Sequence, residues 1–267
     1  FNSDGFTLGT GSNVNRASHT NVAWNWKAGG SASSNSNGTI TSSVSANTDA
    51  GFSIGTYNGS GSDNTVGHGL GVAPDMIIVK CKSTAHDWVV YHSALGNAKI
   101  LTLNATTVAQ SASGWQSTSP TSTVFSIDNA ANSLNQSGQS FVFYAMASKK
   151  GYSKFGSYIA NANVDGAFVY TGFKPAFLII KNTSQATDWI MYDNKRDGFE
   201  PQNKEFRANT SAAERNAEDN NVQFCANGFK LRNAGTKSNA DSGNTLIYMS
   251  FAEQPLVTST GVPATAR

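Results

Sequence analysis

The feature that most constrains the fold of this chain is that its sequence repeats itself. Two stretches recur with a displacement of 101 positions, residues 71–80 in residues 172–181 and residues 86–92 in residues 187–193. The identical residues include Lys80 and Lys181 in the first match, and Trp88 and Trp189 in the second. Repetition at this spacing predicts two structural units of about 100 residues, a typical size for one domain.

A further pair of motifs occurs three times. Each copy begins with a short apolar block and continues through an Asn/Ser-rich turn into an alternating run. The apolar blocks are GFTL (5–8), VFSI (124–127) and GFKL (228–231). The alternating runs are NVAWNWKA (21–28), SFVFYAMA (140–147) and TLIYMSFA (245–252). The first copy has no complete repeat around it, so we interpret it as the closing hairpin of an earlier repeat or domain.

These matches divide the chain into four parts, namely residues 1–48, 49–149, 150–255 and 256–267. The first part holds the N-terminal hairpin and then a linker, because positions 29–48 are almost entirely Ser, Asn, Gly, Ala and Thr. The second and third parts are the complete repeats, and the fourth is expected to be an extended C-terminal tail. Within the second repeat, Thr210–Asp219 is predicted to be a short helix with Ser211 as its N-cap.

Hydrophobic periodicity predicts that the repeats are built from strands. In the first alternating run, Val22, Trp24 and Trp26 stand on alternate positions and therefore share one face of an extended strand. Met76–Val79 and Phe177–Ile180 are continuously apolar, as expected for strands that are buried on both faces or central in a sandwich. A polar turn and a hairpin partner follow each, so each repeat contains at least five short strands. The predicted class is all-β, with two tandem antiparallel β-sandwiches of jelly-roll type.

Composition and charge exclude several classes of partner. Charged residues make up only 13% of the chain and the formal net charge is +2, which is too small to indicate nucleic-acid binding. The longest apolar run is only a few residues, so we expect no membrane insertion. Cys81 and Cys225 form neither a CxxC pair nor a Cys/His cluster, so we favour two buried thiols over a zinc site or a disulfide. The chain begins at Phe1 without a signal peptide, which indicates a fragment or the ordered part of a longer protein.

The polar residues show no arrangement that is typical of catalysis. His68 lies between two glycines, but the matching position of the second repeat is Val169, so we interpret it as a turn histidine. Asp87 and Asp188 each precede a tryptophan, and we interpret them as turn residues that bind backbone amides rather than as a glycosidase pair. The mixed charges between residues 195 and 219 are expected to form surface ion pairs. We therefore expect no catalytic residue, no metal site and no cofactor.

Loops that differ between the repeats are candidates for a recognition surface. They span residues 58–64, 109–121 and 194–209. Trp115 lies in a polar loop, and an exposed aromatic side chain can stack on a sugar ring. Trp24, Trp88 and Trp189 stand at positions where the repeats place large apolar residues, so we interpret them as core. The candidate ligand-binding residues are Trp115, Asn58, Asp63, Asn194 and Asp197.

In combination, the motifs resemble a known β-rich module. They are TVGHGLGVAPDMIIVK (65–80), DWVVYH (87–92), GYSKFGSY (151–158), YTGFKPAFLIIK (170–181), TDWIMYD (187–193) and NGFKLR (227–232). The module occurs in virion proteins of tailed phages, especially marine ones, at the C-terminal end of tail fibres and other structural proteins. The resemblance extends from Gly5 to about Ala266. It implies a virion component and transfers no catalytic residue.

The resemblance and the residues together favour a non-enzymatic structural protein of the phage virion, outside the cell. We expect a tail-fibre or tail-tip module that attaches to a glycan or protein of the host surface. Its other partners would be virion proteins and further copies of itself, with a trimer as the expected oligomer by analogy with fibres. A capsid decoration or head-fibre protein is one alternative. A polysaccharide depolymerase or a secreted lectin is another.

Overall fold

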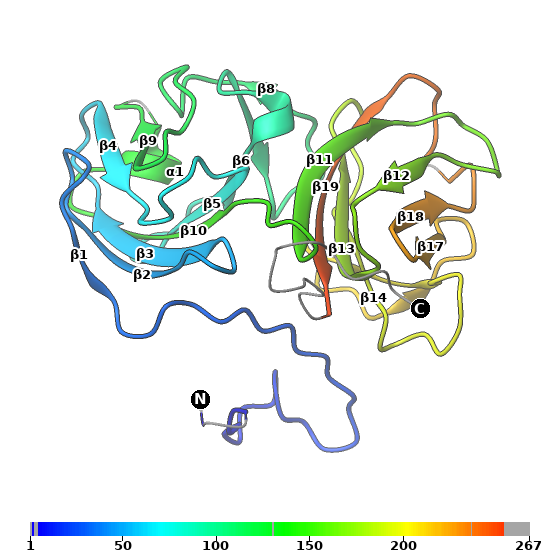
Figure 1. The fold of residues 1–267 in the computed structure, drawn as a ribbon. Coiled ribbons are helices and arrows are strands. Elements are labelled where there is room, and N and C mark those ends of the chain that lie inside the picture. Colours follow the sequence, from blue (N-terminus) through cyan, green and yellow to red (C-terminus); the bar gives the residue numbers. More distant parts are fainter. Residues whose placement is uncertain (1, 3–4, 130, 236, 254–267) are drawn as a thin grey trace.

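The structure is a computed structural model that describes residues 2, 5–129, 131–235 and 237–253. It is nearly all β and consists of antiparallel sheets, which confirms the predicted all-β sandwich class. Two sandwiches stand side by side, one for each complete repeat (Figure 1). The tail predicted at 256–267 lies outside the described residues. Among those residues, no helix has the length and hydropathy needed to cross a membrane.

The first sandwich combines an eight-stranded sheet with a two-stranded sheet. In spatial order, the large sheet contains β1 (Ser33–Asn35), β2 (Ser42–Asn47), β3 (Phe52–Asn58), β10 (Ser140–Met146), β5 (Met76–Cys81), β6 (Val89–His92), β7 (Lys99–Thr102) and β8 (Gln110–Ser111). The small sheet contains β4 (Asn64–Gly67) and β9 (Val124–Ile127). Two single helical turns, η1 (Ser93–Leu95) and α1 (Asn132–Asn135), lie in the connections.

The second sandwich has the same plan with fewer strands. Its large sheet contains, in spatial order, β11 (Ser153–Ile159), β19 (Thr245–Ala252), β13 (Pro175–Asn182), β14 (Ile190–Asp193), β15 (Lys204–Arg207) and β16 (Arg215–Asn216). Its small sheet contains β12 (Phe168–Tyr170), β18 (Gly228–Leu231) and β17 (Val222–Cys225). The predicted hairpins are confirmed, since β5 pairs with β6 and β13 pairs with β14. The strand β10 and its counterpart β19 are central in their sheets.

The central strands are apolar on both faces because each large sheet lies between two cores. In β10, Phe141 and Phe143 point into the core of the first sandwich, whereas Tyr144 and Met146 point towards the second sandwich. The same alternation in β13 and β19 divides their side chains between the second core and the contact of the two sheets. The prediction that Phe177–Ile180 is buried on both faces is confirmed. In the matching run of the first repeat, only Ile78 is partly exposed.

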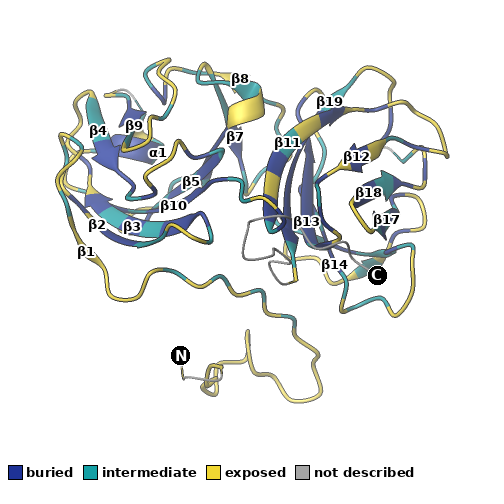
Figure 2. Cartoon of the chain, in the orientation of Figure 1, coloured by how far each residue is buried: buried dark blue, intermediate teal, exposed yellow. Residues whose placement is uncertain are grey.

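A third core joins the two sandwiches. It forms where the outer faces of the two large sheets meet, and Figure 2 shows the facing strands as buried. Met76, Val90 and Met146 contribute from the first sandwich, and Phe177 and Met249 contribute from the second. Burial of this apolar area stabilises the pair by roughly 25 cal/mol per Å². The two repeats therefore form one packed body rather than two independent domains.

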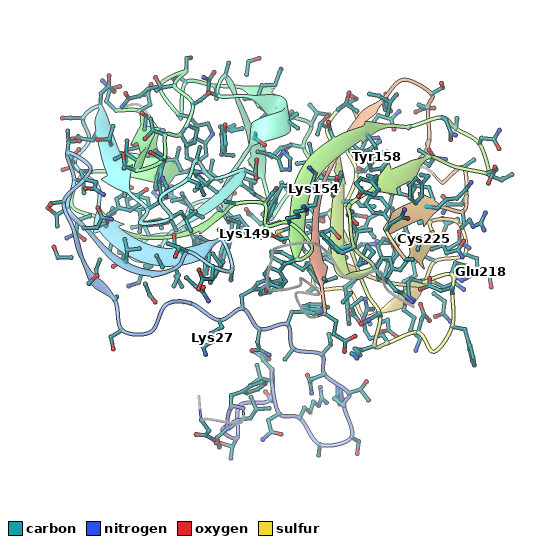
Figure 3. The ribbon with its side chains drawn as sticks, viewed as in Figure 1. Lys27, Lys149, Lys154, Tyr158, Glu218 and Cys225 are labelled. Atoms are coloured by element: carbon teal, nitrogen blue, oxygen red, sulfur yellow. The ribbon has the colours of Figure 1, made fainter. Side chains whose placement is uncertain are left out.

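The N-terminal hairpin predicted within residues 1–48 is wrong. Residues 21–28 belong to no strand; they form an extended strap that crosses beneath both sandwiches (Figure 1). Trp24 and Trp26 pack on Phe177, with ring centroids 5.4 Å apart in both pairs. The predicted alternation nevertheless holds, because the even-numbered residues of the strap are partly buried and Lys27 projects away from the sheets (Figure 3). Side-chain packing on an aromatic surface replaces a β-ladder here.

The linker predicted at 29–48 is also wrong, because β1 and β2 lie within it and extend the first large sheet. Strand β2 pairs with β3 over five residues, from Ser43 opposite Thr56 to Asn47 opposite Phe52. The Ser-rich composition concealed a half-buried strand in which Val44 enters the first core. Ser45 is satisfied locally, because its hydroxyl donates to the Gly30 carbonyl at 2.7 Å.

The helix predicted over Thr210–Asp219 does not form. The segment contains the short strand β16, in which Arg215 lies opposite Glu205 of β15. The Thr210 hydroxyl accepts a hydrogen bond from the Ala212 N–H at 3.3 Å, a local contact that favours a turn over a helix. Pairing with the fully buried Glu205 outweighs the helix propensity of the alanines.

The repeated lysines occupy matching positions but different surroundings. Lys80 Nζ donates to the carbonyl of His86 at the hairpin turn. Lys181 is fully buried, and its three N–H groups are shared among four carbonyl oxygens, those of Asn182 (2.8 Å), Thr187 (3.0 Å), Thr106 (3.1 Å) and Gln185 (3.5 Å). Burial lowers the pKa of Lys181 to about 8. Because Thr106 belongs to the first sandwich, this ammonium group links the two sandwiches.

Lys181→Met should therefore destabilise the protein more than Lys80→Met does. The first change removes the donor from a buried and three partly buried hydrogen bonds to carbonyl oxygens, which costs about 2–4 kcal/mol. The second removes a single contact at the surface and should cost about 1 kcal/mol or less. Chemical denaturation of the two variants measures both values. Equal losses would show that the cluster of carbonyls around Lys181 is energetically unimportant.

Candidate functional site

The two aspartates that precede tryptophans are structural in both repeats. Asp87 accepts the side-chain amide of Asn104, and Asp188 accepts that of Asn209, both at 2.9 Å. Each asparagine oxygen then accepts the backbone N–H of the following tryptophan, at 2.8 Å in the first repeat and 2.9 Å in the second. The aspartates therefore bind an asparagine side chain rather than the backbone amides that the sequence predicted. Both carboxylates therefore stabilise a hairpin by holding its asparagine side chain in place.

Some charged residues of the second repeat form the surface ion pairs that the sequence predicted, such as Arg215 with Asp219 and Lys204 with Glu214, whereas others are buried. Glu205 is fully buried, and its Oε1 lies 3.0 Å from Arg207 and 3.5 Å from both Arg215 and Lys237. Arg196 is nearly buried, with its Nε 2.6 Å from Asp193. The carboxylates of Glu205 and Asp193 thus bind cations of the same sandwich. The cluster fixes the β14–β15–β16 edge.

A hollow lies on the outer face of the first large sheet. It has a volume of about 280 Å³ and is lined by uncharged polar residues, which are Ser34, Thr41, Ser42, Ser43, Thr56, Tyr57, Asn58 and Ser140. We call it the hydroxyl groove. Strands β1, β2, β3 and β10 form its floor.

The strand register explains why hydroxyl groups gather there. Ser34 lies opposite Ser43, and Ser43 lies opposite Thr56, so the three side chains form a row across the sheet. Neighbouring residues such as Val44 point to the opposite face and enter the core. The row continues through Val142, which lies opposite Thr56. The inner face of this part of the sheet is thus apolar, and its outer face is rich in hydroxyl groups.

An aromatic pair stands on the same sheet face. Trp88, which precedes β6, stacks on Tyr144 of β10 with ring centroids 6.4 Å apart and an interplanar angle of 20°. Both rings are partly exposed. Lys80 lies between Val142 and Trp88 in the row, with its ammonium group held at the hairpin turn. The expectation that Trp88 is a core residue is therefore only partly met.

The second sandwich has no such open row. Ile247, Lys181 and Trp189 occupy the equivalent places and are fully buried. The end of β7 and the loop that follows it cover them: Trp189 Nε1 donates to the Thr102 carbonyl at 2.9 Å, and the Ala109 N–H donates to the Thr183 carbonyl at 3.0 Å. The outer row is thus closed in one repeat and open in the other.

Of the five predicted ligand-binding residues, only Asn58 lines the groove. Trp115 is wrong as an exposed contact, because only 1% of it is accessible. Its ring packs edge-to-face against Tyr91 and Phe125 in the first core, with centroids 5.7 and 6.3 Å away. The polar neighbours of Trp115 in sequence form a turn at the surface while the indole points inward.

The other three predicted residues serve local turns in separate places. Asp63 accepts the Asn129 N–H at 2.8 Å, and Asp197 accepts the Lys204 N–H at 2.7 Å. The Asn194 side chain donates to Glu253 at 3.2 Å. Asn58 and Asp63 belong to the first sandwich and the other two belong to the second. The structure therefore does not bring the five residues together.

Sequence reasoning missed most of the groove. Ser34, Ser43 and Thr41 fall in the segment that looked like a linker, and Thr56 lies outside the predicted recognition loops. The available signal was the alternation of Ser43 and Ser45 with Val44. That pattern is typical of a strand with one hydroxyl face.

His68 is one of two buried histidines. His68 Nδ1 accepts the Leu70 N–H at 3.3 Å, so it is a turn residue as predicted. The residue that corresponds to His68 in the second repeat is Thr171 rather than Val169. Val169 corresponds to Val66, because these two valines lie opposite equivalent residues of β18 and β9. Burial lowers the pKa of His68. Within the described residues, no group of three or more His, Cys, Asp or Glu side chains is placed to hold a metal ion.

Both cysteines are free thiols, as expected, although only Cys81 is buried. Hydrogen bonds from Thr84 and Ser83 outweigh the effect of burial and lower the pKa of Cys81 to about 7. The Thr84 hydroxyl lies 3.1 Å from Sγ. These contacts satisfy the thiol within its hairpin turn.

The chain matches, over residues 1–255, the family described as Domain of unknown function (DUF7483). This match covers nearly the whole chain, so the chain belongs to that family. No curated protein and no solved structure matches it.

His92 connects the two sandwiches through its ring. Its Nδ1 accepts the Ala94 N–H at 3.2 Å, so Nε2 carries the proton and donates to the Tyr248 carbonyl of the second sandwich, also at 3.2 Å. Burial lowers the pKa of His92 to about 4, against the smaller opposing effects of this hydrogen bond and of Asp75. Protonation would charge a buried ring and remove its acceptor nitrogen.

The stability of the protein should therefore fall as the pH drops from 6.5 towards 4. In this window the unfolded state binds a proton at His92 and the folded state does not. The contribution of His92 to the free energy of unfolding is therefore fully present above the unfolded pKa of 6.5 and is lost as the pH falls. The full effect is at most about 3 kcal/mol. His92→Gln, which retains a donor for Tyr248, should show a shallower pH dependence in urea denaturation. An unchanged slope would remove His92 as the cause.

Proposed function

We propose that this chain is a non-enzymatic module of a tailed-phage virion that attaches to a neutral glycan of the host surface through the hydroxyl groove. The resemblance of its motifs to the virion module supports the first half of this proposal. The lining of the groove carries the second half, because it is made of uncharged polar residues and because Ser34, Ser43 and Thr56 form a row of hydroxyl groups across the sheet. Tandem sandwiches are suited to display such a surface, because strands hold side chains more firmly than loops do.

The chemistry of the groove fits a neutral sugar. Hydroxyl and amide groups both donate and accept hydrogen bonds, as sugar hydroxyls do. None of the lining residues is charged, so an anionic sugar would gain no ion pair. The stacked Trp88 and Tyr144 add an aromatic surface on the same sheet face, suited to the apolar face of a sugar ring.

The absence of carboxylates from this lining favours binding over cleavage. A glycosidase needs two carboxyl groups roughly 5–10 Å apart across the scissile bond. Asp87 and Asp188 are held by asparagines in separate hairpins, and Glu205 is buried among cations. The groove therefore supports recognition of a glycan without its hydrolysis.

Binding can be tested on a printed array of neutral and acidic oligosaccharides, followed by calorimetric titration of the best ligand. We expect neutral sugars to bind and Ser43→Arg, which fills the groove, to weaken binding at least about tenfold, or 1.4 kcal/mol. Ser62→Arg, at an exposed turn of the same sandwich, is the matched control and should bind normally. Binding that survives Ser43→Arg, or no binding of any neutral sugar, would refute the glycan site.

The place of the chain in the particle is tested separately. Antibodies against this protein should label the tails of purified virions in immunogold electron microscopy. Labelling of the capsid would instead support a decoration protein, and particles that lack the chain would refute a virion role. The glycan array and the microscopy can fail independently.

A further inference from the structure

Among the described residues, no strand pairs with the outer side of β12 in the small sheet of the second sandwich, and we call this side the free edge. Strand β12 is the outermost strand in the order β12–β18–β17. The Leu231 N–H donates to the Ala167 carbonyl at 3.1 Å and the Thr171 N–H donates to the Asn227 carbonyl at 3.0 Å, so odd-numbered residues face β18. The main-chain groups of Phe168 and Tyr170 therefore point away from the sheet. A free edge of this kind is a template for another strand.

The first sandwich covers the equivalent edge. Strand β4 corresponds to β12, and its outward carbonyls belong to Thr65 and Gly67. The Ile40 N–H donates to the Thr65 carbonyl at 3.0 Å, and the Ser42 hydroxyl donates to the Gly67 carbonyl at 2.7 Å. Ile40 also forms a parallel bridge with Val66. The covering segment precedes β2, and the second sandwich has no counterpart of it because only the short turn from β10 to β11 precedes its first strand.

The open edge also differs from the covered one in polarity. Large apolar residues of β12 are strongly exposed, namely Phe168 (48%) and Tyr170 (65%), and so are Ile159 (55%) and Val164 (70%) in the segment that leads to β12. The covered edge has Thr65 and Gly67 where the open edge has Phe168 and Tyr170. An exposed apolar edge is a liability for an isolated chain and is typical of a contact surface.

The same chain carries an extended segment of the matching type. We call residues 5–20 the arm; it extends away from both sandwiches, as Figure 1 shows. Its block GFTL (5–8) matches VFSI of β9 and GFKL of β18, the two segments that pair with β4 and β12. Within the described part of the arm this block lies in no strand. Leu8 is 42% exposed and Val14 is 52% exposed.

We propose that the arm of one copy of this chain adds as a strand to the free edge of β12 in a second copy. The backbone groups of Phe168 and Tyr170 would bind the arm, and its apolar side chains would cover the exposed ones around the edge. Such a contact is heterologous, because the arm and the edge are different surfaces, so it closes into a ring or continues as a chain of copies. This proposal is independent of the glycan groove, which lies on the other sandwich.

Light scattering coupled to size-exclusion chromatography tests whether the arm of one copy binds the β12 edge of another. We expect the wild type to be oligomeric, and both Leu8→Asp and Tyr170→Pro to be monomeric. The first places a charge on the arm, and the second removes the outward N–H of β12 without affecting the ladder with β18. A mixture of the two variants should form a dimer, because one supplies an intact arm and the other an intact edge.

Control variants distinguish a loss of arm binding from misfolding and from assembly through other surfaces. Phe199→Asp alters an apolar residue that is 90% exposed but lies outside the arm and the edge, and it should remain oligomeric. Phe168→Asp leaves the backbone donors in place and should also weaken assembly, and circular dichroism confirms that each variant folds. A monomeric wild type at the highest attainable concentration would overturn the proposal. So would an oligomer that persists in Leu8→Asp, which would indicate direct pairing of two β12 edges.

Discussion

The contact between the outer faces of the two large sheets is the constraint on which the rest of the structure depends. Because each sheet lies between its own core and this shared one, strands such as β10 and β13 must be apolar on both faces. Residues that would be solvated in a single sandwich become interior, among them Trp189 and Lys181. Lys181 retains its charged form only by binding backbone carbonyls, since a buried ammonium group requires partners.

The two sandwiches are covered at different places, and the two similar repeats therefore expose different surfaces. The loop after β7 seals the outer row of the second sandwich, whereas the corresponding row of the first remains open as the hydroxyl groove. Conversely, β2 and Ile40 cover the edges of the first sandwich, and β12 of the second remains open. Each repeat is closed where the other is accessible. Divergence between duplicated units has thus placed two different surfaces on one scaffold.

The sequence predicted most of the fold but little of the candidate site. Alignment of the repeats and the periodicity of Phe177–Ile180 correctly indicated buried central strands, because burial on both faces leaves a clear pattern. Composition misled at residues 29–48, where serines on one strand face looked like a linker. Trp115 was misplaced because a polar turn says nothing about where its one large side chain points. The groove depends on strand register between distant segments, which no local pattern contains.

The strap has a mechanical consequence. Trp26 packs on Phe251 of β19, the last described strand, with ring centroids 5.4 Å apart, so the strap is held against the second sandwich. The Lys27 carbonyl also accepts the Asn47 side chain of the first sandwich at 3.1 Å. A pull applied to the arm would therefore act first on the strap, which contacts both sandwiches. Tension from a neighbouring copy would be carried through the whole body without first unravelling the first sandwich from its N-terminal strand.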